Sequence, residues 1–169
     1  MQEISFHRDI LPLRDKLFRL ALRITCNRME AEDVVQDTMM RVWNRRDEWS
    51  AYSSIEAFCL TVVRNLAIDR SERMDARTVV LPPEAEQTPD TSTPYDELTG
   101  NDYRTLLHRL IAALPEQQRT LVQLRDIEGM TYREVACATG MTEEQVKAHL
   151  FKARQKIKKQ FIDIDNYGL

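Results

Sequence analysis

Hydrophobic residues recur at spacings of three and four along most of this chain, which is the pattern of helices with one buried face. The spacing predicts helices over residues 13–26, 30–45, 54–74 and 102–113, and another from Pro115 to about residue 128. Few stretches alternate apolar and polar residues as half-buried strands do. The pattern therefore predicts an all-α fold.

Each of the first three helices has a set of residues that its spacing turns toward a core. These residues are Leu13, Leu17, Leu20, Ala21 and Ile24 in the first, Ala31, Val34, Val35, Thr38 and Val42 in the second, and Ile55, Phe58, Val62, Val63, Leu66 and Ala67 in the third. Side chains three and four positions apart lie on one side of a helix, so each set is expected to pack inward.

Residues 79–100 interrupt the helical pattern. The segment holds four of the six prolines and five acidic residues, but no lysine or arginine. Proline stops helices, and a segment this polar cannot bury enough apolar surface to offset its ordering entropy. We expect a flexible acidic linker between two small helical domains, residues 1–78 and 101–169, because loops of this length are uncommon inside compact folds.

Residues 131–157 have the spacing of a helix-turn-helix, with Thr131 as the expected N-cap of its first helix. Ala136 is small enough for two helices to cross closely, and Gly140 tolerates the left-handed turn. Val146 then anchors the second helix on the first. The second helix is basic, with no acidic residue between positions 145 and 162, which favours binding in a DNA groove. The alternative is an ordinary helical hairpin with a solvated basic face.

The second helix, for which Thr142 is the expected N-cap, has two opposite faces. Helical geometry places Val146, Leu150, Ala153 and Ile157 toward the core. The opposite face is expected to meet DNA, with Glu144, Ala148, Phe151, Lys152 and Gln155 in the major groove and Lys147, Arg154 and Lys158 near the phosphate strands. An apolar ring such as that of Phe151 can contact a thymine methyl group.

The formal net charge of −3 averages over unlike segments. Residues 1–78 carry 13 basic and 13 acidic side chains, residues 79–100 carry none and five, and residues 101–169 carry 11 and nine. Phosphate contacts depend on local charge, so an acidic isoelectric point near 5.7 does not exclude nucleic acid.

The three cysteines, at positions 26, 59 and 137, are widely spaced in apolar helical contexts, which predicts buried, reduced thiols. Neither paired cysteines nor a Cys/His cluster is present, so we expect no metal and no cofactor. The N-terminus lacks the layout of a signal peptide, and no apolar run reaches membrane-spanning length. These features predict a cytoplasmic protein without membrane insertion.

Two helical halves, an acidic proline-rich linker and a C-terminal helix-turn-helix together resemble an ECF (extracytoplasmic function) RNA polymerase sigma factor of the sigma-70 family. The segment AEDVVQDTMMRVW (31–43) is similar to the polymerase-binding helix of that family, and VVRNLAIDRSER (62–73) to the end of its −10 domain. LPEQQRTLVQLRDIEGMTYREVA (114–136) and TEEQVKAHLFKAR after it are similar to the −35 domain. The resemblance implies a protein that binds core polymerase, recognises both promoter elements and promotes DNA melting. It also implies an anti-sigma factor as a regulator.

The resemblance also implies roles for single residues. It implies core polymerase binding by Asp33, Gln36, Asp37 and Met40, for which the alternative is a solvated acidic first turn that suits the helix dipole. It implies −10 DNA binding by Trp49, Tyr52, Arg64, Asn65, Asp69 and Arg70. Trp49 either stacks on unpaired bases or folds back as a lid on the core, and an Arg64–Asp69 pair is an alternative for those two residues.

This chain departs from the family at a few of these positions. Phe58 stands where relatives often carry tryptophan, and Ala148 where they often carry serine. At positions 147 and 152 this chain has lysine where relatives often have arginine. Lysine cannot make the bidentate contacts to guanine that arginine makes, so the resemblance does not predict which −35 sequence is recognised.

Two other functions fit parts of the chain. A helix-turn-helix regulator that never binds core polymerase would account for residues 114–160 only. A metal-dependent nucleotide hydrolase would use Glu30, Asp33 and Asp37, which share one helical face. Such a site needs a second carboxylate pair on a facing helix, and Glu56, Asp69 and Glu72 do not have that spacing. We therefore expect no enzymatic activity.

Overall fold

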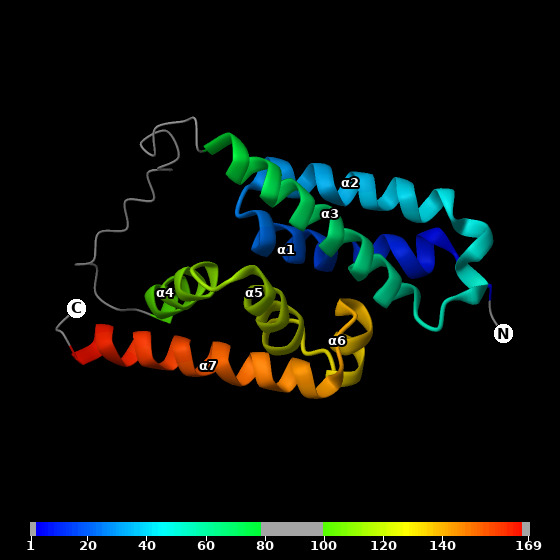
Figure 1. The fold of residues 1–169 in the computed structure, drawn as a ribbon. Coiled ribbons are helices and arrows are strands. Elements are labelled where there is room, and N and C mark those ends of the chain that lie inside the picture. The colour runs from blue at the N-terminus through cyan, green and yellow to red at the C-terminus, as the bar shows by residue number, and fades with distance from the viewer. Residues whose placement is uncertain (1–2, 79–99, 167–169) are drawn as a thin grey trace.

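The computed structural model describes residues 3–78 and 100–166 as helices and short turns (Figure 1), and no strand occurs in these two ranges. The predicted all-α fold is confirmed. Almost all of the predicted linker, residues 79–99, lies outside the described residues. No helix in the described ranges is long and apolar enough to cross a membrane.

The N-terminal half is a bundle of α1 (Arg14–Thr25), α2 (Arg28–Asn44) and α3 (Ile55–Thr78). Two short helical turns, Phe6–Ile10 and Leu11–Leu13, lead into α1. Apolar side chains from all of these elements meet in one core, in which Ile10, Leu17, Leu20, Ile24, Val34, Val42, Leu60 and Val63 are at most 1% exposed. The inward faces predicted for the first two helices supply most of this core.

The turn between α1 and α2 explains why α2 starts earlier than the apolar spacing predicts. Cys26 ends α1 in the left-handed conformation, with φ of 54°. Asn27 then caps α2, because its side chain accepts a hydrogen bond from the backbone N–H of Glu30 at 3.0 Å.

The predicted inward face of α3 is partly wrong. Its buried residues are Ala57, Cys59, Leu60, Val63 and Ala67, whereas Phe58, Val62 and Leu66 are only half-buried. The cause is that α3 packs against α1 and α2 on one side and against α6 (Tyr132–Thr139) on another. A helix with partners on several sides has no single apolar stripe from which one face can be read.

The C-terminal half contains α4 (Gly100–Ala112), α5 (Glu116–Val122), α6 (Tyr132–Thr139) and α7 (Glu143–Asn166). A π-helical turn, Gln123–Ile127, continues α5. Its core joins α5, α6 and α7, where Leu121, Leu124, Val135, Val146, Leu150 and Ala153 are fully buried.

The helix-turn-helix forms from α6 and α7 as the sequence predicts. Gly140 ends α6 with φ of 71°, and its N–H bonds the carbonyl of Ala136 at 2.9 Å. Thr142 and Gln145 form a capping box at the start of α7, with reciprocal bonds of 3.0 and 3.1 Å. Thr131 caps α6 by accepting from the N–H of Glu134 at 3.1 Å. Both predicted N-caps are confirmed.

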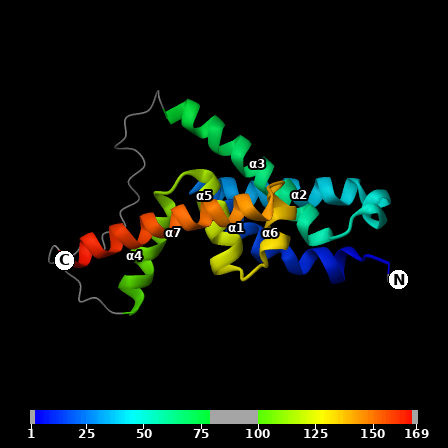
Figure 2. The same ribbon diagram turned by 60° about the horizontal axis from the view of Figure 1, so that its bottom comes forward.

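The two halves contact each other through α1 and α3 on one side and α5, α6 and the turn after α5 on the other (Figures 1 and 2). Arg19 forms a bidentate pair with Glu128, with Nη2 2.9 Å from Oε2. Arg23 donates to Gln123 at 3.0 Å, and Thr61 donates its hydroxyl to the carbonyl of Ala138 at 2.9 Å. No pattern in the sequence predicts this interface.

Two of the three cysteines are not buried, contrary to the prediction. Cys26 is exposed at the left-handed end of α1, and Cys137 is exposed on the outer side of α6. Only Cys59 is buried, in α3. Burial raises the pKa of its thiol to about 12, so it remains a thiol at neutral pH.

Candidate nucleic-acid and partner interfaces

An acidic face on α2 brings together two residues predicted to bind polymerase. Asp33 and Asp37 lie one turn apart with side chains 50% and 43% exposed. Both contact the guanidinium of Arg70 from α3, at 2.6 and 3.3 Å, and Glu30 contacts it at 2.8 Å. The hydrogen bonds that Arg70 donates to Glu30 and Asp33 raise its pKa. Arg70 was predicted to bind −10 DNA, and here its charge is directed at α2.

This arrangement also bears on the hydrolase alternative. Glu30, Asp33 and Asp37 do share a face, as their spacing predicts, but a guanidinium occupies the point at which they converge. Within the described ranges, no group of His, Cys, Asp and Glu is arranged to hold a metal ion.

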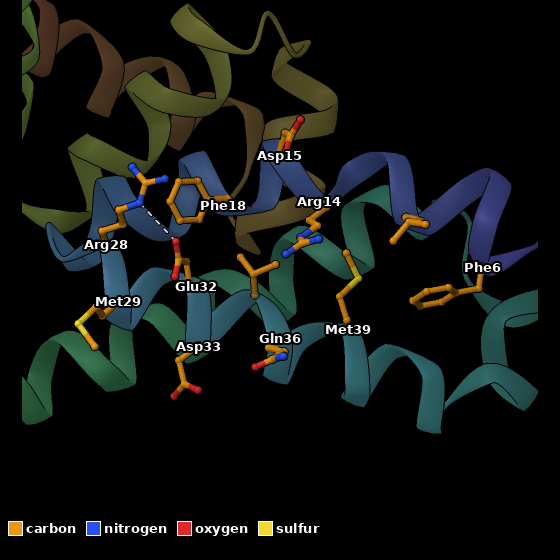
Figure 3. Close-up of a pocket in the computed structure, with 12 residues that line it drawn as sticks. Phe6, Arg14, Asp15, Phe18, Arg28, Met29, Glu32, Asp33, Gln36 and Met39 are labelled. Atoms are coloured by element: carbon orange, nitrogen blue, oxygen red, sulfur yellow. Dashed lines mark hydrogen bonds and ion pairs between the residues drawn. The ribbon is translucent and has the colours of Figure 1, made fainter.

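A groove of about 740 Å³ runs beside the acidic face, between α1 and α2 (Figure 3). Its apolar lining comes from Phe6, Leu11, Phe18, Met29, Val35 and Met39, and its polar lining from Arg14, Asp15, Arg28, Glu32, Asp33 and Gln36. Figure 3 shows Asp33 and Gln36 projecting from α2 on the side away from Phe18. Met40 does not line the groove but is 62% exposed on the same helix.

Trp49 folds back as a lid on the core and is not exposed for stacking on unpaired bases. It is 6% exposed, and its Nε1–H donates to the carbonyl of Val42 at 2.9 Å. The turn that carries it, Arg46–Ala51, is a short 3₁₀ helix and not the open loop that its polar sequence indicates. Tyr52 stacks on Phe58 with ring centroids 4.1 Å apart, so one of its ring faces is already occupied.

A second groove, of about 680 Å³, lies between the C-terminal part of α2 and α3. It brings Asn65 and Asp69, predicted to bind −10 DNA, next to Arg41, Asn44 and Arg45. Asp69 pairs with Arg73 at 3.0 Å, so the alternative Arg64–Asp69 pair is not formed.

Arg64 points to a different side of α3. Its Nε lies 3.8 Å from Glu116 of α5, and its side chain is only 17% exposed. The interface between the two halves therefore covers a residue predicted to contact DNA.

The outward face of α7 matches the predicted set. All of its members are exposed: Glu144, Lys147, Ala148, Phe151, Lys152, Arg154, Gln155 and Lys158. Phe151 is 64% exposed, which is unusual for a large aromatic residue, while its neighbour Leu150 is fully buried. Arg154 is not free on this face, because Asp126 holds it with contacts of 2.6 and 3.1 Å and raises its pKa.

An apolar groove of about 550 Å³ lies on the C-terminal half, where α4, α7 and the turn after α5 meet. Leu107, Ile127 and Ile162 line it and are each more than 40% exposed. This surface was not predicted, although the continuous apolar spacing of α4 and the end of α7 indicates it.

Family models match both halves of the chain. A model described as Sigma-70 region 2 matches residues 10–77, and one described as Sigma-70, region 4 matches residues 104–157. The ECF RNA polymerase sigma factor SigL of Mycobacterium tuberculosis is 33% identical over 138 residues, which are 81% of this chain and 77% of SigL. The chain belongs to the ECF sigma factors of the sigma-70 family. SigW of Bacillus subtilis is 24% identical over 92% of this chain and 89% of its own length.

Two solved structures have the same fold as this sigma factor. RpoE from Bartonella quintana, in complex with the anti-sigma factor NepR, matches with a TM-score of 0.65 and 23% identity over 91% of this chain and 94% of RpoE. CnrH, in complex with the cytosolic domain of CnrY, matches with a TM-score of 0.63 and 19% identity over 92% and 86%.

The surroundings of three arginine side chains in this sigma factor were not predicted from the sequence. Arg41 joins the groove that contains Asn65, Arg70 faces the acids of α2, and Arg64 faces the other half of the molecule. Only the first had a visible signal, the basic end of the segment 41–46. The other two depend on how α3 is rotated against its neighbours.

Proposed function

We propose that this sigma factor binds core RNA polymerase, directs it to promoters with −35 and −10 elements, and helps melt the DNA. Residues 1–78 would bind core and the −10 element, residues 101–169 the −35 element, and residues 79–100 would link them. The protein would act in the cytoplasm. The acidic face of α2 is the main support for this proposal, because the alternative function, a helix-turn-helix regulator that does not bind core polymerase, does not explain it.

The polymerase-binding surface comprises Asp33, Gln36, Asp37 and Met40. The carboxylates are close to half exposed and lie beside a groove with apolar and charged walls. Such a surface suits a helical segment that carries basic and apolar side chains, since opposite charge guides encounter and methionine adapts to its partner.

The −10 surface centres on the groove between α2 and α3. Asn65 and Asp69 supply hydrogen-bonding groups, and Arg41 and Arg45 supply positive charge for a DNA strand. Arg64 would join them only when the two halves separate. Trp49 is better suited to support this surface from the core than to stack on a base, because it is 6% exposed.

The −35 surface is the outward face of α7. Buried Val146, Leu150 and Ala153 fix the helix, which leaves the opposite side chains available to a major groove. We also propose an anti-sigma factor as a regulator, because the solved structure of RpoE contains the anti-sigma factor NepR.

Co-elution with purified core polymerase tests the proposal against the regulator alternative. The double substitution Asp33→Arg and Asp37→Arg should abolish co-elution of the full chain and leave its helical circular dichroism unchanged, because both side chains are close to half exposed. A matched control reverses Asp47 and Glu72, which are also exposed and lie off this face. Wild-type co-elution of the Asp33/Asp37 variant would refute polymerase binding through α2.

A further inference from the structure

Arg70 is placed to organise the acidic face of α2. Its Nη1 lies 2.8 Å from Oε2 of Glu30 and 2.6 Å from Oδ2 of Asp33, and its Nη2 lies 3.3 Å from Oδ2 of Asp37. Three carboxylates on successive turns of one helix thus converge on one guanidinium from another helix.

The cluster is not neutral. One cation faces three anions, so a net charge of about −2 remains near neutral pH. Without the cation, three carboxylates this close would repel one another and separate. Arg70 therefore fixes their positions and still leaves an overall attraction for a basic partner.

The contacts also leave acceptor capacity on the two more exposed acids. Arg70 contacts Oδ2 of Asp33 and Oδ2 of Asp37. A carboxylate has two oxygens and about four acceptor positions, so each group can bond a second donor from outside. Both side chains are more than 40% exposed, which makes those positions accessible.

Arg70 is poorly placed to contact DNA in the −10 groove. That groove is lined by Asn65 and Asp69, whereas the side chain of Arg70 is turned to α2 and only 27% exposed. A guanidinium already shared among three carboxylates has little positive potential left for a phosphate.

We propose that Arg70 is a positioning residue for polymerase binding, which holds Asp33 and Asp37 in place for lysine or arginine side chains of core polymerase. This inference rests on the proposed function of α2. The planar guanidinium suits this role because it offers fixed donors on two separate nitrogens, Nη1 and Nη2, whereas a lysine ammonium has its three donors on one freely rotating atom.

The test is the dissociation constant of the full chain for purified core polymerase. Arg70→Gln should weaken binding about tenfold, as expected when charged neighbours are coupled. Arg70→Lys should fall between this variant and wild type. Arg73→Gln is the matched control: it removes the same charge on the same helix, from a side chain that is 65% exposed and pairs with Asp69. It should change binding less than about twofold.

Measuring Arg70→Gln in a chain that already carries Asp33→Asn separates a positioning role of Arg70 from general damage to the fold. If Arg70 acts through Asp33 and Asp37, then Arg70→Gln should weaken binding less once Asp33→Asn is present than it does alone. Independent, additive losses from the two substitutions would contradict a positioning role. Thermal unfolding of each variant checks its fold, and Arg70→Lys serves as the test if Arg70→Gln is destabilised.

The outcomes distinguish the inference from the proposed function. If the Asp33/Asp37 reversal abolishes core binding but Arg70→Gln binds as wild type does, the positioning role is wrong and the polymerase face stands. If the Arg70→Gln holoenzyme binds single-stranded −10 DNA more weakly and its salt slope falls by about one, with core binding unchanged, Arg70 is a phosphate contact. If the Asp33/Asp37 reversal itself still binds core, both proposals fail.

Discussion

Leu150 and Phe151 are neighbours on α7 with opposite environments, since Leu150 is fully buried and Phe151 is 64% exposed. We expect Leu150→Ala to cost about 2–5 kcal/mol of stability, because it leaves a cavity in the core. Phe151→Ala should change stability by less than about 0.5 kcal/mol. It should instead weaken binding to a preferred −35 duplex by about 1–3 kcal/mol. Chemical denaturation and duplex binding of the full chain measure the two effects.

The comparison of matched and scrambled −35 duplexes separates base reading from charge. Phe151→Ala and Lys152→Ala should reduce affinity mainly for the matched duplex. Lys158→Ala should weaken both alike and lower the salt slope by about one unit. Lys158 is the better residue for testing a phosphate contact, because substitution of Arg154 would also break its ion pair with Asp126. Equal losses on both duplexes for Phe151→Ala and Lys152→Ala would show that this face does not read sequence.

Residue environments could be predicted from sequence where one helix has one buried side. The core and outward residues of α7 follow from its spacing alone, because its apolar positions repeat regularly and face one core. Trp49 could not be placed, since a tryptophan in a polar turn can either cover the core or face solvent. Its choice depends on the carbonyl of Val42, which the end of α2 offers to the ring N–H.

At the scale of elements, the turn between α6 and α7 depends on Gly140. Its φ is 71°, and a Cβ added there would meet no atom within 4 Å. Any cost of a side chain is therefore conformational. We expect Gly140→Ala to destabilise the full chain by about 1–2 kcal/mol and Gly140→Asn by less, because asparagine tolerates the left-handed region. Urea unfolding tests this ranking, and equal stability of the alanine variant and wild type would contradict it.

Element boundaries and element rotations differ in how well the sequence specifies them. Boundaries follow from local chemistry, as with Thr131 and Thr142, whose hydroxyls cap the two helices of the helix-turn-helix. The rotation of α3 follows from long-range packing against α1, α2 and α6. For that reason the roles of Arg64 and Arg70, which depend on this rotation, could not be predicted.

At the scale of the whole molecule, the two halves are closed on each other. Elements centred near −35 and −10 are about 25 base pairs apart, which is about 85 Å of duplex. While α3 contacts α6, we expect the proposed −35 and −10 surfaces to lie too close together to span that distance. We therefore expect the halves to separate on a promoter, which would also uncover Arg64.

Substitutions in the Arg19–Glu128 pair can test whether the two halves stay in contact. The hydrogen bond from Arg19 lowers the pKa of Glu128, whose side chain is 6% exposed. Arg19→Glu should open the molecule, because it sets two acids against each other at a buried contact. The double substitution Arg19→Glu and Glu128→Arg should close it again. Small-angle X-ray scattering measures the radius of gyration, and an unchanged radius in the single variant would contradict the role of this pair.

Closure should also depend on pH through His108. Arg23 donates to Nδ1 of His108 at 2.8 Å, and this contact requires the neutral imidazole. Partial burial, together with Arg23 and Arg104, lowers the pKa of His108 below its usual 6.5. A lowered pKa in the closed form means that the contact contributes fully above about pH 6.5 and is lost as pH falls through the lowered value.

We therefore expect the radius of gyration to rise as the pH falls from about 7.5 to about 5.5. His108→Gln keeps an acceptor for Arg23 without a titrating ring, and its radius should change less over the same range. An identical response in wild type and His108→Gln would assign the pH dependence to other groups.

Transcription by purified core polymerase on a genomic promoter library shows directly whether this chain acts as a sigma factor. With the full chain added, we expect new transcript starts whose upstream DNA shares one −35 and one −10 motif. The Asp33→Arg and Asp37→Arg variant should give none of these starts, and the Asp47/Glu72 reversal should give all of them. If the wild-type chain binds DNA but adds no specific starts to core polymerase, it does not act as a sigma factor.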